Sequence, residues 1–126
     1  MLKVTCAIIQ HEGKTLAVKR SAVMQLPLKW EFPGGKIEMG ENEEDCIIRE
    51  VKEELNLDIA ILRKLNSSVH HYPHISIELI PFIAKQTGGS ICLKEHAEFN
   101  YLTKNELLSL DWSEADFPIV KEYIAQ

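Results

Sequence analysis

Two runs of mainly apolar and β-branched residues, 3–9 and 15–19, begin the chain. The polar tetrapeptide His11-Glu12-Gly13-Lys14 separates them. Apolar, β-prone runs joined by a short polar segment with glycine are typical of β-hairpins. The pattern therefore predicts a hairpin that opens a sheet.

A loop is expected over residues 20–29, followed by the short aromatic run Trp30-Glu31-Phe32. Pro33-Gly34-Gly35 then indicates a turn, where glycine lets the backbone approach a neighbour closely because it has no Cβ. This segment is a candidate for close contact with a ligand.

A helix is predicted from Asn42 to Asn56. Asn42 is a good N-cap and is followed by three acids that suit the positive end of a helix dipole. Apolar residues then recur every four positions, at Ile47, Val51 and Leu55. Asn56 marks the helix end because asparagine tolerates the left-handed conformation.

The second half of the chain is rich in strand patterns. Strands are expected over residues 59–65, 69–72, 75–84, 91–93 and 99–102, with a turn at Gly88-Gly89. The capping-box form Thr103-x-x-Glu106 predicts a short helix through Leu110, and 113–116 would begin a last helix. This order favours an α/β (α+β) fold with a mixed sheet packed between helices.

Composition adds limits to this picture. The 126 residues are 45% hydrophobic and 26% charged, which predicts one globular domain over 1–126. A net charge of −5 argues against nucleic-acid polymers or anionic membranes as partners. Three distant cysteines indicate no disulfide framework, and no apolar run is long enough for a signal peptide or membrane span. We expect a soluble, cytoplasmic monomer or homodimer.

The negative charge is concentrated in one segment. Residues 38–58 contain nine acids and two bases, which alone would describe a solvated helix face. However, Glu50, Glu53 and Glu54 project from the same helix face, where like charges destabilise an isolated helix by about 0.2–0.5 kcal/mol per pair. Carboxylates gathered in this way favour a divalent cation such as Mg²⁺.

Residues 35–57 resemble the Nudix box. Gly35, five residues, Glu41, seven residues and then Arg49-Glu50-Val51-Lys52-Glu53-Glu54-Leu55-Asn56-Leu57 follow its pattern. One position departs, since Asn56 stands where the family has glycine, although asparagine can take the same positive φ. Residues 30–38 and 16–20 are also similar to MutT-type Nudix hydrolases, so the resemblance covers nearly the whole chain.

The resemblance implies the Nudix fold, an α/β/α sandwich with a loop–helix–loop, and hydrolysis of a nucleoside diphosphate linked to another group. It implies Mg²⁺ or Mn²⁺ as cofactor and a small-molecule nucleotide as substrate. The implied metal ligands are the Gly34 carbonyl, Glu50, Glu53, Glu54 and, from a later loop, Glu95, with Glu98 as the alternative. Glu50 or Glu53 is the expected base; Arg49, grouped with the catalytic residues, is expected with Glu41 to brace the loop and helix.

Further candidates for substrate binding surround this motif. Arg20 and Lys36 are the best cations for phosphate oxygens. Trp30 and Phe32 line a base pocket or fill the core, and His74 is a candidate substrate contact. The histidines lack the helical spacing of a zinc site. The full set of expected substrate-binding residues is Arg20, Trp30, Glu31, Phe32, Pro33, Gly35, Lys36, His74 and Asp116.

Asp116, in the segment Ala115-Asp116-Phe117-Pro118, bears on the choice of nucleotide. An ionised aspartate only accepts hydrogen bonds, which suits an exocyclic amine such as cytosine N4. Similar sequences in MutT-type relatives place this segment near the base, and helix capping is the competing role. The leading hypothesis is a pyrophosphohydrolase of CTP, dCTP or oxidised pyrimidine nucleotides, releasing the monophosphate and pyrophosphate. The alternatives are 8-oxo-dGTP hydrolysis and a non-catalytic nucleotide-binding module.

Overall fold

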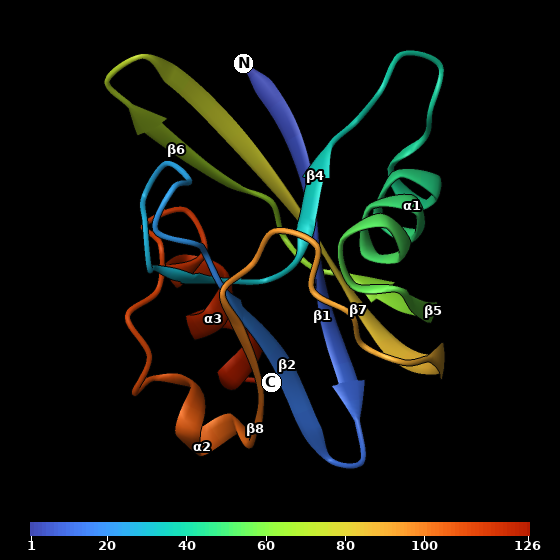
Figure 1. Cartoon of the computed structure of the whole chain (residues 1–126). Helices are drawn as coiled ribbons and strands as arrows, with labels where there is room; N and C mark the ends of the chain where they lie inside the picture. Colours follow the sequence, from blue (N-terminus) through green and yellow to red (C-terminus); the bar gives the residue numbers. More distant parts are fainter.

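A computed structural model describes all residues, 1–126, and shows one mixed sheet with helices on both faces (Figure 1). The strands are β1 (Leu2–His11), β2 (Lys14–Lys19), β3 (Trp30–Glu31), β4 (Gly34–Lys36), β5 (Leu57–Lys64), β6 (Ser68–Tyr72), β7 (Ile75–Gly89) and β8 (Glu98–Leu102). The helices are α1 (Glu43–Leu55), α2 (Lys104–Leu107) and α3 (Phe117–Ile124). In Figure 1, α1 lies on one side of the sheet, and α2 and α3 lie on the other. This arrangement confirms the predicted fold class.

The sheet combines parallel and antiparallel pairing. Its main path is β3-β2-β1-β7-β5, in which only β1 and β7 are parallel. β4 pairs with β1, β6 with β7 and β8 with β2, all antiparallel. β1 is therefore central, and the short strand β4 is held beside it, directly before α1.

Strand β1 divides the hydrophobic core into two layers. Cys6 and Ile8 belong to the cluster that includes α3, whereas Ala7 and Ile9 belong to the cluster that includes α1. Successive side chains of a strand point to opposite faces, so a strand covered on both faces must be apolar throughout this stretch. Each fully buried isoleucine contributes about 1.5–3 kcal/mol.

Helix α1 begins and ends as predicted. The Asn42 side chain accepts a hydrogen bond from the Asp45 N–H at 2.7 Å. Ile47, Val51 and Leu55 are fully buried. Asn56 ends the helix in the left-handed conformation with φ 58°, so asparagine does adopt the geometry required of the glycine it replaces.

Three predicted elements differ in the structure. Residues 91–93 form no strand, because their backbone turns onto the end of α1, where the Cys92 N–H donates to the Leu55 carbonyl at 2.9 Å. Gly88 and Gly89 continue β7 instead of turning, because β5 pairs with both of them. α2 ends at Leu107, not Leu110, since the chain beyond it continues with tighter i to i+3 bonds.

The predicted turn at Pro33-Gly34-Gly35 is also partly a strand. Gly34 and Gly35 pair with Cys6 and Thr5 of β1. A Cβ on Gly34 would collide with the Thr5 backbone, so glycine is required by close approach within the sheet. None of the helices is long and apolar enough to cross a membrane.

Candidate active site

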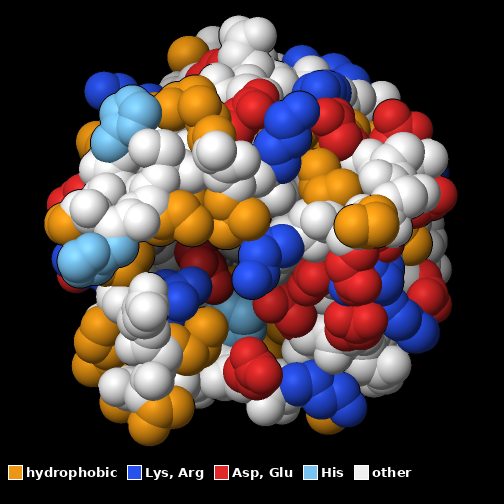
Figure 2. Space-filling view, turned by 90° about the horizontal axis from the view of Figure 1, so that it is seen from above, with side chains coloured by type: hydrophobic (Ala, Val, Ile, Leu, Met, Phe, Trp, Pro, Cys, Tyr) orange, Lys and Arg blue, Asp and Glu red, His pale blue; other side chains and the backbone are white.

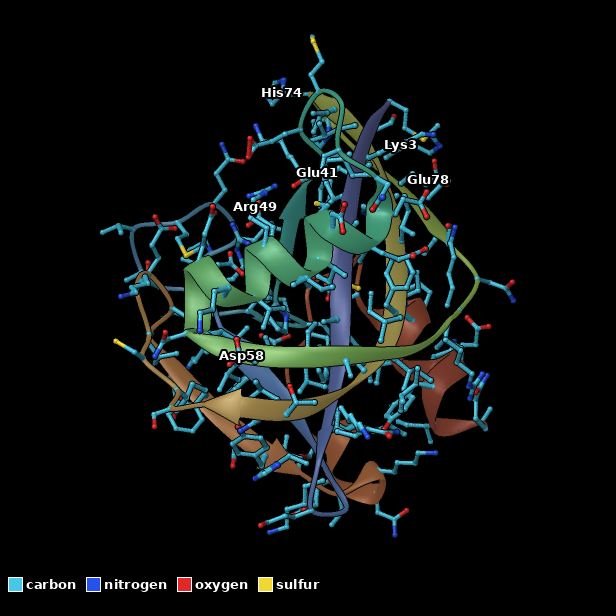
Figure 3. All side chains as sticks on the ribbon, turned by 90° about the vertical axis from the view of Figure 1, so that its right-hand side faces the viewer. Lys3, Glu41, Arg49, Asp58, His74 and Glu78 are labelled. Atoms are coloured by element: carbon cyan, nitrogen blue, oxygen red, sulfur yellow. The ribbon has the colours of Figure 1, made fainter.

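Arg49 of α1 holds the loop that precedes the helix. Its Nε and Nη2 donate to the two Glu41 carboxylate oxygens at 2.7 and 2.9 Å, and Nη2 also donates to the Lys36 carbonyl at 3.3 Å. Figure 3 shows Arg49 and Glu41 together at one side of α1. The guanidinium lowers the pKa of Glu41 to about 2. This geometry supports the expected bracing role of the pair.

The third nitrogen of Arg49 faces two candidate metal ligands. Nη1 donates to Glu50 Oε1 at 2.9 Å and to Glu53 Oε2 at 3.1 Å. The Glu50 side chain is 16% exposed, whereas that of Glu53 is 60% exposed. The helical spacing therefore does bring both carboxylates to one cation, but only Glu50 is enclosed.

Gly35 gives Glu50 its space. A Cβ on Gly35 would overlap the Glu50 carboxylate, so any larger residue would displace this side chain. The two glycines of β4 thus make room for different neighbours. Gly34 allows strand β1 to approach, and Gly35 leaves space for the Glu50 carboxylate of α1. The requirement at Gly35 comes from packing at the site and not from a positive φ.

Glu54 is the most perturbed carboxylate of the helix. Burial raises its pKa to about 8, and the nearby charges of Glu31, Glu50 and Glu95 act in the same direction. The Gly34 N–H donates to Glu54 Oε1 at 3.2 Å and partly offsets the effect. Negative charge from three separate segments therefore converges on Glu54.

The oxygen atoms gathered at this site are of the chemical type that a hard divalent cation binds. Carboxylate oxygens and a backbone carbonyl are the ligands that Mg²⁺ and Mn²⁺ prefer, and the crowding at Glu54 is the condition that a cation relieves. No group of three or more His, Cys, Asp or Glu side chains is already drawn together as a metal cage. Arg49 occupies oxygens of Glu50 and Glu53.

A cavity of about 830 Å³ lies beside the glutamates. Glu50 and Glu54 form part of its wall, while Phe32, Tyr72 and Asp116 line it elsewhere. Figure 2 shows this face hollowed, with acidic side chains gathered on one side of the hollow and hydrophobic ones on the other. Its size is within the range of small-molecule sites.

Most, but not all, of the expected site residues line this cavity. Those that do are Arg20, Glu31, Phe32, Gly34, Gly35, Lys36, Glu50, Glu54, His74 and Asp116; those that do not are Trp30, Pro33, Arg49, Glu53 and Glu95. His74 lies at the outer end of the molecule in Figure 3, at the turn between β6 and β7. Lys36 is exposed and has no ion-pair partner, which leaves its ammonium free for an anion.

The two aromatic candidates, Phe32 and Trp30, occupy different positions relative to the cavity. Phe32 is buried, packs against Trp112 with ring centroids 4.8 Å apart and also lines the cavity. Trp30 packs against the core, pairs with Trp112 through the backbone and does not line the cavity. Pro33 is buried, and its carbonyl accepts the Ala7 N–H at 2.8 Å. Trp30 and Pro33 therefore have positions of structural residues.

Arg20 lines the cavity and is paired with neighbouring groups there. Its Nη1 donates to Glu31 Oε1 at 2.8 Å, and its Nε donates to the Gln25 carbonyl at 2.6 Å. Its charge also acts on Asp116 and Tyr72, which line the same cavity, and lowers their pKa values. In the structure it orders Glu31 and the loop 20–29 instead of standing free.

Asp116 does not cap α3, although it occupies the N-cap position. Its side chain accepts the Phe32 N–H at 2.9 Å and the Ser113 hydroxyl, and the residue is 5% exposed. Burial first, and then the Glu31 charge, raise the pKa of Asp116 to about 7. The Asp116 side chain therefore makes no capping hydrogen bond, because its carboxylate is directed to the backbone just after β3 and lines the cavity.

Several cavity residues were not expected from the sequence. Tyr72, Ser113 and the apolar wall formed by Cys6, Met24 and Leu79 belong to segments with no motif. His96, one of the histidines that lack the spacing of a zinc site, is buried against Glu31. The strand pattern of residues 69–72 was the only available signal for Tyr72.

The chain was compared with known proteins. The NUDIX domain family model matches residues 1–123. The CTP pyrophosphohydrolase of Escherichia coli K12 is 28% identical over 99% of this chain and 93% of its own length. The 8-oxo-dGTP diphosphatase of the same strain is 28% identical over 94% and 93%. The solution structure of the E. coli ORF135 protein superposes with a TM-score of 0.88 at 28% identity, covering 99% of this chain and 89% of that one.

The chain belongs to the Nudix family. The family model spans nearly all of its residues, and the fold agrees with that of solved relatives. It is a hydrolase of this family, whose members act on nucleoside diphosphate-linked compounds and generally use divalent metal ions.

Proposed function

We propose that this protein is a nucleoside triphosphate pyrophosphohydrolase that releases the nucleoside monophosphate and pyrophosphate, with preference for CTP, dCTP or oxidised pyrimidine nucleotides. The main support is that the buried Asp116 carboxylate lines the same cavity as Glu50 and Glu54. The E. coli relatives named CTP pyrophosphohydrolase and 8-oxo-dGTP diphosphatase support the reaction type. Cytoplasmic location and a monomeric or homodimeric state remain predictions from the sequence.

The metal would be Mg²⁺ or Mn²⁺ held by the Gly34 carbonyl, Glu50, Glu53, Glu54 and Glu95. The support is the pKa of Glu54, which burial and then the charges of Glu31, Glu50 and Glu95 raise to about 8, because a divalent cation can replace the proton that such a carboxylate otherwise takes up. When bound, such an ion neutralises phosphate charge and lowers the pKa of a water ligand. Lys36 would add a fixed positive charge for phosphate oxygens.

Glu50 is better placed than Glu53 to act as the base. Glu50 lines the cavity, whereas Glu53 lies outside it and is mainly exposed. A base must reach the water that it deprotonates to within about 2.6–3.2 Å, directly or through one water. Glu50 would hold the attacking water, with Arg49 fixing the orientation of its carboxylate.

Asp116 would recognise the base. Its carboxylate already accepts from the Phe32 N–H and the Ser113 hydroxyl, so it presents its remaining acceptor capacity to the cavity. The exocyclic amine of cytosine is a matching donor. Phe32 and Tyr72, which line the same cavity, offer apolar and aromatic surface for the ring.

Hydrolysis of 8-oxo-dGTP is the second candidate, and one observation favours it. The pKa of Asp116, raised to about 7 by burial and the Glu31 charge, leaves a large protonated fraction near neutral pH. A protonated carboxyl donates a hydrogen bond as well as accepting one, which suits a carbonyl of an oxidised guanine.

A panel of nucleoside triphosphates with Mg²⁺ separates these candidates. We expect kcat/KM for CTP or dCTP to exceed that for 8-oxo-dGTP by at least tenfold at pH 8, with pyrophosphate as product. The preference should fall at pH 6, since protonation of Asp116 places a donor on a carboxyl group that only accepts when it is ionised. A tenfold preference for 8-oxo-dGTP would reverse the assignment, and binding heat without product would favour the non-catalytic module.

Asp116→Asn tests the role of this side chain directly. The amide keeps one acceptor and adds a donor, so selectivity between CTP and 8-oxo-dGTP should change by about tenfold or more. Asp111→Asn is the matched control, because Asp111 is exposed and pairs only with Lys29. Equal selectivity in the wild type and Asp116→Asn would show that Asp116 does not contact the base.

A further inference from the structure

His96 is a buried histidine with one unpartnered nitrogen. Its side chain is 1% exposed and lies in the segment between β7 and β8, next to Glu95. Nε2 is 2.8 Å from Glu31 Oε2, whereas Nδ1 is buried without any hydrogen-bond partner. Because an ionised carboxylate only accepts, Nε2 carries the proton and donates.

Each oxygen of the Glu31 carboxylate has a hydrogen-bond donor, His96 at one and Arg20 at the other. Arg20 Nη1 donates to the other Glu31 oxygen at 2.8 Å. Two donors on opposite oxygens fix the plane of the carboxylate, while the Glu31 side chain remains 17% exposed and lines the cavity. Each oxygen retains a lone pair, so Glu31 can accept a further hydrogen bond from a molecule in the cavity.

The segment around His96 has other attachments. The Ala97 N–H donates to the Lys19 carbonyl at 2.9 Å, and the Lys94 N–H donates to the Glu54 carbonyl at 3.2 Å. These main-chain bonds hold the segment on β2 and α1 from both sides of His96. The imidazole is therefore not needed to anchor its own backbone.

A buried imidazole at this position destabilises the fold relative to an apolar side chain. Burying a polar atom without a partner destabilises the folded state, and an apolar side chain of similar size would avoid that penalty at Nδ1. What an apolar residue would not provide is the Nε2–H donor to Glu31. The penalty of the unpartnered Nδ1 is thus offset by the hydrogen bond that orients the Glu31 carboxylate.

We propose that His96 is a positioning residue for substrate recognition: its Nε2–H, opposite Arg20, orients Glu31 so that the carboxylate accepts a hydrogen bond from an N–H or O–H group of the nucleoside. This role rests on the proposed function, since it takes the cavity as the nucleotide site. It extends that function by assigning Glu31 and His96 as one unit that acts beside Asp116.

His96→Leu and His96→Gln test the proposal in the full-length protein. His96→Leu removes the donor and should raise KM for the preferred nucleotide about tenfold, while kcat stays within about threefold. His96→Gln retains an N–H donor and should recover part of the loss. His11→Leu is the matched control, because His11 lies at the hairpin between β1 and β2, away from the cavity.

A double-mutant cycle with Glu31→Gln shows whether His96 acts through Glu31. In the Glu31→Gln background, His96→Leu should change KM by less than twofold. Mn²⁺ affinity without nucleotide should be the same in the wild type and His96→Leu. A KM effect that persists without Glu31, or lost Mn²⁺ affinity with KM unchanged, would overturn the proposal and indicate a role in holding Glu95.

Two measurements do not depend on turnover. The affinity for CTP in EDTA, measured by calorimetry, should weaken about tenfold in His96→Leu. This measurement needs no turnover. If the wild type released no pyrophosphate, the proposed reaction would be refuted, whereas the proposed role of His96 in binding could still be tested. Nitrogen NMR of wild-type His96 should show a protonated Nε2 whose signal shifts in Glu31→Gln, even where His96→Leu does not fold. An unprotonated Nε2, or equal CTP affinity in a folded His96→Leu, would contradict the proposal.

Discussion

Two groups of carboxylates near α1 are in opposite electrostatic states. The outer group, Glu38, Glu41 and Glu53, surrounds the Arg49 guanidinium. The inner group, Glu54 and Asp116, lines the cavity, where the charge of Glu31 acts on both carboxyls. The pKa of Glu41 is lowered to about 2, while those of Glu54 and Asp116 are raised to about 8 and about 7.

The difference shows what each group is suited to. A carboxylate beside a guanidinium is already neutralised and gains little from a second cation, so the outer group stabilises the loop and helix. Buried carboxylates that repel one another favour a proton, a metal ion or a hydrogen-bond donor of a ligand. The acidity of this segment therefore has a structural part and a part directed at ligands.

Glu54→Gln should give the largest effect and separates the two groups most clearly. It removes a carboxylate of the inner group at nearly constant volume, so turnover with Mg²⁺ should fall about 10³-fold. Glu44→Gln is the control, because Glu44 is exposed on the same helix. Steady-state kinetics with both variants check this, and turnover within tenfold of the wild type would refute a role for Glu54 in metal binding.

Arg49→Lys weakens the outer group. Lysine cannot reproduce the paired bonds to Glu41 together with those to Glu50 and Glu53, so kcat should fall about 10–100-fold and Tm by about 5 °C. Kinetics and thermal melting report the two effects. Arg63→Lys, at an exposed arginine, is the control, and wild-type values for Arg49→Lys would show that the bracing is dispensable.

The inner group should make the metal-free protein less stable as pH rises. Its folded-state pKa values lie above those of the unfolded chain, so the stabilisation is complete below about pH 4 and is lost progressively up to about pH 8. Melting in EDTA should show Tm falling from pH 5 to pH 8, and Glu54→Gln should flatten this fall by about 5 °C. Parallel curves for the wild type and the variant would contradict the assigned pKa of Glu54.

The outer group should act with the opposite sign and the smallest effect. The Glu41 pKa is lowered to about 2, so its contribution is present above about pH 4.5 and is lost as pH falls through 2. Urea unfolding should therefore show that Glu41→Gln destabilises the protein more at pH 5 than at pH 2.5. A difference that does not change with pH would mean that the ion pair with Arg49 contributes nothing to stability.

Local features were predictable because they depend on neighbours in the chain. Asn42, Asn56 and the apolar positions between them determined the limits and buried face of α1. The turn expected at Gly88-Gly89 was wrong, because pairing with β5 decided that segment. The site followed the same division, since Glu50 and Glu53 share a helix face through spacing alone, whereas the state of Glu54 depends on Glu31 and Glu95 from other elements.

Residue spacing within 23 positions of the chain is enough to define the Nudix motif, the helix that carries it and the concentration of charge. Which residues face the cavity depends instead on how distant segments pack together. The sheet brings His96 to Glu31 across 65 positions and Asp116 to Phe32 across 84. Contacts at such separations depend on how the strands pair and pack, and their burial in turn sets the protonation of the carboxylates.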